Sequence, residues 1–355
     1  MTAPADTLRA DASAWDAFVE AAPTGSYTQL TAWARVKRAN GWRSVRLVVD
    51  GRSGPLGLQL LVRDLRPTPW RVGYAPRGPV GGDFDAAGVA ALTESLWLAA
   101  RRLRLVQVTI DPEVQADHPL VGHLDRAGWR PTASIQADRT RLLDLRRPED
   151  QLWADLRSKC RQYVSKARRA GVTVEDAGAA GLDDFYRLYV ETARRAGFVH
   201  RSQRAYEDVF RAYGATDRAR LLLARLPDGK AAAALLLLTC GRRVIEPYGG
   251  MSEAGARSRA NYLLKWEAIR SSRERGFEVY DMWGVAHAGI ERFKSGFGGR
   301  EVAFVGGRML VVDRLGNAVT NLARRGLVGA ARLRHGVRGG DGAGAAGGPT
   351  DADAT

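Results

Sequence analysis

The chain has 355 residues, of which 45% are hydrophobic and 26% charged, so it has a globular composition and room for two domains. Its two cysteines stand far apart without the spacing of a zinc site or a disulfide framework, and neither is expected. The net charge of +15 favours a polyanionic partner such as RNA, a nucleotide or an anionic membrane face, although a genome that favours arginine would raise the charge without any function.

The longest apolar run covers only residues 231–239, which is too short to cross a membrane and predicts a buried strand. The N-terminus lacks the basic-then-apolar pattern of a signal peptide. We therefore expect a cytoplasmic protein, with peripheral contact at the inner membrane face left open.

Helix and strand signals alternate along the first region, residues 14–137. Two strands separated by Gly51 and Gly54 predict a hairpin, and a Gly/Pro-rich segment, residues 72–83, follows them. We expect helices within residues 15–22, 27–42, 86–104 and 118–131, and strands within residues 44–50, 54–65 and 105–113.

The second region repeats this order of elements. Two strands flank Pro227, Asp228 and Gly229, which predict another hairpin. We expect strands within residues 218–226, 231–239, 242–251 and 277–284, a Gly/Ser/Arg loop before residue 261, and helices within residues 261–276 and 288–299. Asp111 and Asp281 close equivalent strands, so we interpret the two regions as an internal repeat.

Between the two regions, residues 149–171 predict one long basic helix. Its apolar residues recur at intervals of three and four and form one face: Leu152, Leu156, Cys160, Tyr163, Val164 and Ala167. A second helix is expected to end at Gly197. Residues 336–355 are low in complexity with little to bury, and we expect them to be disordered.

The repeated unit resembles the fold of the acetyl-CoA-dependent N-acetyltransferases (GNAT fold). That resemblance implies an α/β protein of two tandem GNAT-like domains with mixed sheets flanked by helices: residues 1–141, completed by residues 305–335, and residues 142–304. Members that bind coenzyme A hold its pyrophosphate at a helix N-terminus after small loop residues. Asn261 and Tyr262 stand where small residues are needed, which disfavours coenzyme A.

Three stretches resemble the Fem family of aminoacyltransferases, which make peptidoglycan interpeptide bridges. Residues 159–172 (KCRQYVSKARRAGV) follow its K-x-R-x-x-[IV]-x-x-A-x-x-x-G-V segment, residues 293–299 (FKSGFGG) its Phe-Lys-x-x-Phe-Gly segment, and residues 261–284 its long helix and next strand. Weaker matches occur at residues 28–37, 74–80 and 109–113. Together they span residues 27–299 in the family's order, and the combination is specific.

The resemblance implies transfer of an amino acid from aminoacyl-tRNA to the stem-peptide amine of a peptidoglycan precursor, UDP-MurNAc-pentapeptide or lipid II. A single helix links Gly249 to Gly284, with no room for a helical arm, so the chain is similar to the compact members, which act on the UDP-linked precursor or add the first residue of a bridge. We expect a monomer with no metal, no dissociable cofactor and no DNA partner. Because the donor ester is already activated, positioning of the amine and stabilisation of the oxyanion would carry much of the rate.

Lys294 is the first candidate for a catalytic charge. It stands between Phe293 and Phe297 in a Gly-rich turn, and by resemblance it would bind the tRNA end or the developing oxyanion; a solvated lysine at a helix end is the alternative. Phe293 is its aromatic companion. Asp111, at a strand end, could accept a proton from the attacking ammonium or could cap the next turn with Pro112.

Five further residues are candidates for binding the precursor: Lys37, Arg77, Arg201, Tyr206 and Tyr248. By resemblance Lys37 would bind the diphosphate, although the helix dipole also favours a lysine at a helix C-terminus. Arg201 suits a phosphate or carboxylate because a guanidinium can donate two parallel hydrogen bonds, and Arg204 could replace it. Tyr248 would line the peptide channel, and Arg77 would either help to bind the nucleotide or hold a turn.

Four basic residues on the long helix are candidates for contacts with tRNA phosphates: Lys159, Arg161, Lys166 and Arg168. A solvated polar face on a helix that bridges the two halves is the alternative, and the arginine cluster at residues 101–104 competes for the same role.

Three other functions stay open. The first two are an acetyl-CoA-dependent N-acetyltransferase and a tRNA-dependent aminoacyltransferase of secondary metabolism. The third is a non-catalytic RNA-binding protein, which would bind tRNA whether or not the tRNA carries an amino acid.

Overall fold

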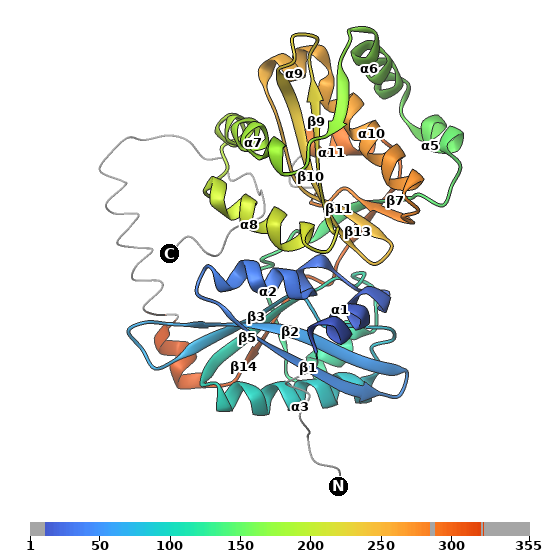
Figure 1. The fold of residues 1–355 in the computed structure, drawn as a ribbon. Helices are drawn as coiled ribbons and strands as arrows, with labels where there is room; N and C mark the ends of the chain where they lie inside the picture. The colour runs from blue at the N-terminus through green and yellow to red at the C-terminus, as the bar shows by residue number, and fades with distance from the viewer. Residues whose placement is uncertain (1–10, 285–287, 321, 323–355) are drawn as a thin grey trace. The chain divides into compact units, whose positions relative to one another are not determined.

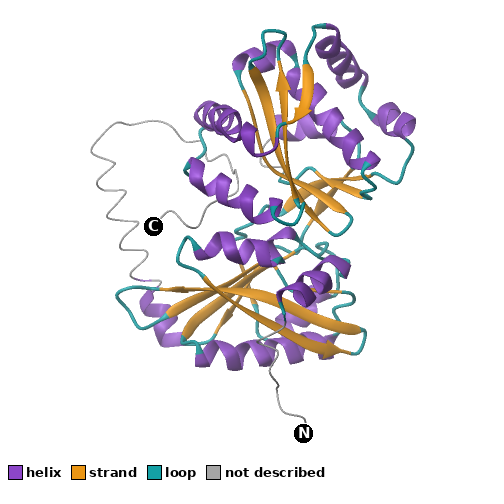
Figure 2. Ribbon diagram, viewed as in Figure 1, coloured by secondary structure: helices purple, strands orange, loops and turns teal. Residues whose placement is uncertain are grey.

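The computed structural model describes residues 11–284, 288–320 and 322, and the chain divides into two compact units. The first unit runs up to Ser134 and resumes at Val305, and the second runs from Ile135 to Phe304. Each unit is a sheet covered by helices (Figures 1 and 2), so the predicted α/β class is confirmed. The expected disordered tail, residues 336–355, lies outside the described residues.

The first unit contains α1 (Ala12–Ala21), the 3-10 helix η2 (Tyr27–Gln29), α2 (Thr31–Arg38), β1 (Arg43–Gly51), β2 (Gly54–Asp64), β3 (Arg71–Arg77), β4 (Val80–Gly81), α3 (Ala86–Arg102), β5 (Leu105–Pro112), α4 (Leu120–Arg126), β6 (Arg130–Thr132), β14 (Gly307–Val311) and helical residues 314–320 and 322. Its sheet has the order β1-β2-β3-β5-β14-β6, with β4 paired to β2. β1 and β2 form the predicted hairpin, in which Gly51 pairs with Gly54.

The second unit contains β7 (Arg139–Asp144), α5 (Glu149–Asp155), α6 (Ser158–Arg169), β8 (Thr173–Asp176), the 3-10 helix η3 (Gly178–Gly181), α7 (Leu182–Ala196), α8 (Gln203–Gly214), β9 (Ala219–Arg225), β10 (Ala231–Cys240), β11 (Arg243–Met251), α9 (Glu253–Ser258), α10 (Ala260–Glu274), β12 (Val279–Asp281), α11 (Ala288–Ser295) and β13 (Arg300–Ala303). Its sheet has the order β13-β7-β12-β11-β10-β9-β8. As predicted, β9 and β10 form a hairpin, and α7 ends at Gly197, whose positive φ of 73° suits glycine.

The two sheets share one plan, which confirms the internal repeat. β1, β2 and β3 form an antiparallel meander, as do β9, β10 and β11. The last strand of each meander is parallel to the strand that follows the next long helix: β3 to β5 after α3, and β11 to β12 after α10. One inner strand is exchanged between the repeats. β7 follows β6 in the sequence but lies between β12 and β13, whereas β14 follows β13 but lies between β5 and β6.

This exchange decides where the units begin and end. The first unit ends at Ser134 rather than at residue 141, because the whole of β7 pairs with β12 and β13 in the second sheet. The segment from Val305 belongs to the first unit because β14 pairs with β5 and β6 there.

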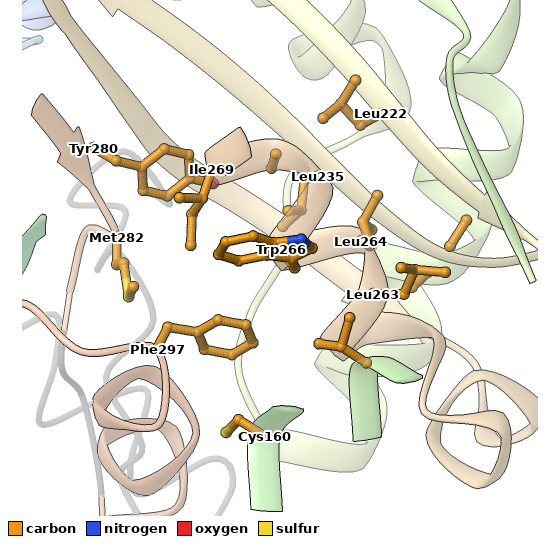
Figure 3. Close-up of a cluster of buried hydrophobic side chains, with 14 of the residues drawn as sticks. Cys160, Leu222, Leu235, Leu263, Leu264, Trp266, Ile269, Tyr280, Met282 and Phe297 are labelled. Atoms are coloured by element: carbon orange, nitrogen blue, oxygen red, sulfur yellow. The ribbon is translucent and has the colours of Figure 1, made fainter. Parts of the chain in front are cut away.

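β10 lies at the centre of the second unit's core, and every residue of this apolar strand is buried. Such complete burial is expected of a strand with both faces of its sheet covered. Leu222 and Leu235 of the sheet face Leu263 and Trp266 of α10 in the cluster drawn in Figure 3. Leu221 and Leu223, the neighbours of Leu222 in β9, face the opposite side of the sheet, beside Gly181 just before α7.

The prediction of a single helix over residues 149–171 is wrong, because the structure has two helices there, α5 and α6. Leu156 and Arg157 between them have extended backbone conformations, and the Arg157 N–H donates to Gly296 O at 2.9 Å. The predicted apolar face is kept, since Leu156 and Cys160 are both buried. Both helices belong to the second unit, where α6 packs against α10.

Two other segments contain regular elements that the sequence analysis did not predict. The Gly/Pro-rich segment, residues 72–83, contains most of β3 and all of β4, and β3 is an inner strand of the first sheet. The Gly/Ser/Arg loop contains α9. Among the described helices, none is long and apolar enough to cross a membrane.

Candidate active site

β11 and β12 separate at Glu246. The two parallel strands pair from Arg243 and Val279 up to Ile245 and Asp281, where β12 ends. A β-bulge in β11 leaves Glu246 and Pro247 opposite Leu237 of β10, and proline suits this place because it has no N–H to donate. The separation admits side chains from α10 and α11.

A buried ion pair fills this point of separation. Lys265 of α10 donates to both carboxylate oxygens of Glu246, and the Tyr280 hydroxyl donates to Glu246 Oε2 at 2.6 Å. Lys265 is 1% exposed and Glu246 9%, and charges are almost never buried so deeply without a partner. Burial lowers the pKa of Lys265 while Glu246 opposes this, and burial together with Glu246 raises the pKa of Tyr280 well above its ordinary value.

Sequence reasoning missed Glu246 and Lys265, although each left a signal. Glu246 interrupts the apolar strand sequence VIEPY, and Lys265 interrupts the apolar helix sequence YLLKW. A single charge inside an apolar run either faces solvent or has a buried partner, and only the fold shows that these two residues are partners.

Lys294 of α11 holds the chain that follows β12. Its ammonium donates to Met282 O at 2.7 Å, to Gly284 O at 2.5 Å and to Trp283 O, which uses all three of its N–H donors. It is therefore not the solvated lysine of the alternative interpretation. Burial, and next the charge of Lys265, lowers its pKa to about 8, against the opposing effect of Glu246 and Asp281.

Asp281 and Trp283 shape the same turn. Asp281 is fully buried, and its Oδ1 accepts hydrogen bonds from the Thr140 hydroxyl and from the Trp283 N–H at 2.8 Å. Trp283 has a φ of 52°, a strained conformation for a residue with a side chain. The turn whose carbonyls accept hydrogen bonds from Lys294 is thus held by Lys294 on its carbonyl side and by Asp281 at the Trp283 N–H.

An aromatic row lies beside Lys294. The ring centroid of Phe293 is 5.0 Å from that of Tyr262 and 5.7 Å from Lys265 Nζ, and Tyr262 is 4.8 Å from Tyr163. The guanidinium of Arg259, whose φ is 63°, lies 4.4 Å from the Tyr163 ring centroid. Large side chains therefore stand at the N-terminus of α10, where a coenzyme A loop needs small residues.

The structure brings together three of the residues predicted to bind the precursor. Tyr206 of α8 and Tyr248 of β11 have ring centroids 5.3 Å apart, and the Arg201 N–H donates to the Tyr206 hydroxyl at 3.3 Å. Tyr189 of α7 joins them, with its ring centroid 5.1 Å from that of Tyr206. Arg204, the alternative to Arg201, is exposed.

Arg77, Asp111 and Lys37 lie in the first unit, and the first two stand at the equivalent end of its parallel strands, β3 and β5. Arg77 ends β3 with a φ of 57°, is 1% exposed, and has its Nε 3.9 Å from Glu113 Oε2. Asp111 near the end of β5 is buried and accepts a hydrogen bond from the Tyr74 hydroxyl at 2.7 Å. Lys37 of α2 is also buried, with its Nζ 5.0 Å from the Trp33 ring centroid.

Two polar residues before α2 hold the end of β3, and sequence reasoning gave them no role. The Thr28 hydroxyl and the Gln29 amide nitrogen donate to Pro76 O at 3.0 and 2.7 Å, and the Gln59 N–H donates to Gln29 Oε1 at 2.6 Å. These bonds join the sequence segments TQLTAWARVK and YAPRGPV next to Arg77.

The four basic residues of α6 do not form one face. Arg161 donates to Ala154 O at 2.8 Å and to Leu156 O, and Arg168 pairs with Glu267 of α10 at 2.9 Å, so both stabilise the local fold. Lys159 and Lys166 are exposed, and their spacing of seven residues puts them on one side of α6. Arg161 and Arg168 each follow a lysine by two residues, which puts them on the other side.

Comparisons with known proteins agree with this architecture. Residues 11–121 match the model of the FemAB family, and residues 154–295 match that of the acetyltransferase (GNAT) domain. The predicted resemblance to the Fem family is therefore confirmed.

Curated relatives match part of the chain. The lipid II:glycine glycyltransferase of Staphylococcus haemolyticus (strain JCSC1435) is 28% identical over 223 residues, which are 59% of this chain and 53% of that protein. The protein of the same name from Staphylococcus aureus (strain MRSA252) is 29% identical over the same shares. The chain thus spans about half the length of these relatives.

Solved structures have the same fold. The crystal structure of FemX superposes with a TM-score of 0.81 at 21% identity, covering 89% of this chain and 99% of that one. A tandem GNAT protein from the clavulanic acid biosynthesis pathway superposes with a TM-score of 0.50 at 12% identity, covering 78% and 87%. The predicted pair of GNAT-like domains is confirmed.

Proposed function

From this resemblance to the Fem family we propose that the chain transfers an amino acid from aminoacyl-tRNA to the stem-peptide amine of a peptidoglycan precursor. The acceptor is UDP-MurNAc-pentapeptide or lipid II, and the product is part of an interpeptide bridge. The two lipid II:glycine glycyltransferases that match the chain support this class of reaction and acceptor.

The proposed reaction is an aminolysis of an ester. The neutral acceptor nitrogen attacks the ester carbonyl carbon, a C–N bond forms, and the bond between that carbon and the ribose oxygen of tRNA breaks. The proton of the attacking amine passes to the ribose oxygen as it leaves. Most of the rate enhancement comes from holding the two reactants together and from stabilising the oxyanion between these steps.

The observation that carries the proposal is the position of Lys294. This residue belongs to the Fem-like segment FKSGFGG, and it projects from α11 towards the carbonyls that follow β12, where β11 and β12 separate. An ammonium whose three donors bind backbone carbonyls can transfer one of them to a substrate oxyanion at the cost of a single carbonyl contact. We propose this role for Lys294, with Phe293 beside it for the terminal base of tRNA.

The remaining candidates divide between the two substrates in this proposal. Arg201, Tyr206 and Tyr248 bind the precursor peptide, since the two tyrosine rings are in contact and the Arg201 N–H donates to the Tyr206 hydroxyl. Lys37 binds its diphosphate, Arg77 helps to bind its nucleotide, and Asp111 accepts the ammonium proton. Lys159 and Lys166 supply exposed charge for tRNA, whereas Arg161 and Arg168 are already engaged within the unit.

Acetyl-CoA is the rival donor because residues 154–295 match the GNAT domain. The aromatic row and Arg259 at the start of α10 favour tRNA over coenzyme A, since bulky side chains there obstruct the approach of a pyrophosphate to the helix N-terminus. We also propose that the enzyme works as a cytoplasmic monomer without a metal or dissociable cofactor, in peripheral contact with the membrane when its acceptor is lipid-linked.

The test is to incubate the protein with radiolabelled aminoacyl-tRNA pools and each precursor, and to weigh the acceptor by mass spectrometry. We expect a mass gain of one amino-acid residue on one precursor. No gain on either precursor with every tRNA would contradict the proposal, and tight binding of acetyl-CoA by calorimetry would favour the acetyltransferase. Equal binding of charged and uncharged tRNA without transfer would favour the RNA-binding protein.

Variants of Lys294 test its role in the same assay. We expect Lys294→Met to lower kcat about 100- to 1000-fold, the usual cost of losing one donor to an oxyanion, while Lys294→Arg keeps part of the activity because the charge stays. Lys166→Met, on the exposed side of α6, is the matched control and should change KM for tRNA more than kcat. A Lys294→Met enzyme as active as the parent would contradict the assignment.

A further inference from the structure

The exposed hydrophobic side chains of this protein are concentrated in its first unit. Among the described residues, the large hydrophobic side chains that are exposed are Trp97, Leu98, Val199, Leu315, Val319 and Leu322. All but Val199 belong to the first unit, on α3 and on the helical residues 314–320 and 322. Single exposed hydrophobic residues are ordinary, but a group of them marks an interaction surface.

The helix of residues 314–320 turns its apolar side outward. Gly316 faces the unit so closely that an added Cβ would lie 2.7 Å from Val106 Cγ1 and 3.0 Å from the Trp70 ring. Leu315 and Leu322 are each 73% exposed, whereas the polar Thr320 is half-buried. This is the reverse of an ordinary surface helix, which buries its apolar residues.

The two segments that carry these exposed residues meet at one end of the first unit, near the start of β5. α3 ends at Arg102, just before β5 begins at Leu105. The segment that leads into the last helix is bound at the same place, because the N–H groups of Val312 and Asp313 donate to Val106 O at 3.0 and 3.1 Å. Figure 1 shows α3 and this last helix, coloured orange-red, on the first unit.

Positive charge accompanies the apolar residues. Arg101, Arg102, Arg104 and Arg314 are exposed, and the Arg101 guanidinium lies 4.8 Å from the Trp97 ring centroid. Glu94, three residues before Trp97 and seven before Arg101, is the nearest acidic residue along α3. In the sequence, residues 323–338 contain five arginines and no aspartate or glutamate.

We infer that this surface, made of Trp97, Leu98, Arg101, Arg102, Leu315, Val319 and Leu322, docks on an anionic lipid bilayer. The transfer of leucine and valine side chains from water into hydrocarbon is favourable, whereas a nucleic-acid backbone offers them little apolar surface. This difference argues against RNA as the occupant. Tryptophan favours the membrane interface, and arginines are attracted by anionic lipid head groups. The inference rests on the peripheral membrane contact proposed above and deepens it, because it assigns that contact to named residues of the first unit.

The test is sedimentation of the full-length protein with vesicles. We expect binding to vesicles that contain phosphatidylglycerol and phosphatidylcholine, and none to phosphatidylcholine alone, since both apolar and charged contacts are needed. The double variant L315Q/L322Q should need at least about tenfold more lipid for half-maximal binding. Val199→Gln, which changes an equally exposed residue of the second unit, is the matched control and should bind like the parent.

Three results would overturn the inference: no binding of the parent protein to anionic vesicles, unchanged binding of L315Q/L322Q, or an equal loss in Val199→Gln. Loss of tRNA binding by L315Q/L322Q with unchanged vesicle binding would identify RNA as the occupant instead. Circular dichroism and melting temperature check that each variant is folded. The vesicles contain no precursor, so failure here is distinct from failure of the transfer assay, and L315Q/L322Q should transfer to the soluble UDP-linked precursor at the rate of the parent.

Discussion

Lys294 is subject to opposing influences on its charge. The three carbonyls that accept its hydrogen bonds favour the ammonium, whereas burial and the nearby charge of Lys265 lower its pKa to about 8 from an ordinary 10.5. Its protonation therefore changes within the range of pH in which enzymes are assayed. If the cation is the active form, as proposed, the rate falls as the pH rises through about 8.

The same shift has a consequence for stability. Because the folded state releases the Lys294 proton at about pH 8 and the unfolded state near 10.5, the unfolded chain binds more protons between these values. The free energy of unfolding should therefore rise with pH over that window. Denaturant titrations of the parent and of Lys294→Met should differ in slope against pH there, and parallel curves would contradict the shift.

Lys265→Met should raise the pKa of Lys294. The charge of Lys265 lowers that pKa more than Glu246 raises it, so the direction holds even if Glu246 takes up a proton once its partner is lost. The measurement is the pH dependence of chemical acylation of the Lys294 amine, followed by mass spectrometry. Lys166→Met is the control and should leave the Lys294 curve in place, whereas an unchanged curve in Lys265→Met would show that the two lysines are not coupled.

At the scale of elements, the turn after α11 is joined to α6. The Arg157 N–H donates to Gly296 O at 2.9 Å, and a Cβ added to Gly296 would lie 2.3 Å from Cys160 Sγ. Two Fem-like segments, KCRQYVSKARRAGV and FKSGFGG, thus meet without space between them. The glycine is required at this position by close packing, and the contact also explains why α5 and α6 are separate helices.

Gly296→Ala should destabilise the protein by about 1–3 kcal/mol, because the new methyl group overpacks against Cys160. Cys160→Ala removes the obstructing sulfur, so the double variant should be less destabilised than the sum of the two single changes. Urea denaturation of all four proteins measures this coupling. Gly214→Ala is the control, since its Cβ would meet only Phe210 at 3.8 Å, and additive effects would mean that the contact does not exist.

At the scale of the whole molecule, the exchange of β7 and β14 makes the two units depend on each other's sequence. The chain enters the second sheet with β7 before the second repeat begins, and returns with β14 to the first sheet after that repeat ends. Such non-local pairing closes long loops, so the first unit cannot complete its sheet until nearly the whole chain is available.

Truncation after Phe304 should unfold the first unit and leave the second folded. The loss of β14 exposes the ladders of β5 and β6 and opens the core around Leu310, which is 6% exposed. Hydrogen exchange should show loss of protection in β5 and retained protection in β10. Truncation after residue 322 keeps every strand that the structure describes and is the matched control; protection of β5 in the shorter protein would contradict the exchange.

The sequence by itself determined the repeat, the hairpins and the family, because turn residues, apolar periodicity and short motifs such as FKSGFGG are local signals. It also singled out Lys294, which the fold holds on three carbonyls where β11 and β12 separate. Only the tertiary structure decided three other features: the exchange of β7 and β14, the break between α5 and α6, and the pairing of Glu246 with Lys265. Each depends on a contact between residues far apart in the chain, and such contacts leave no period or spacing that a single sequence displays.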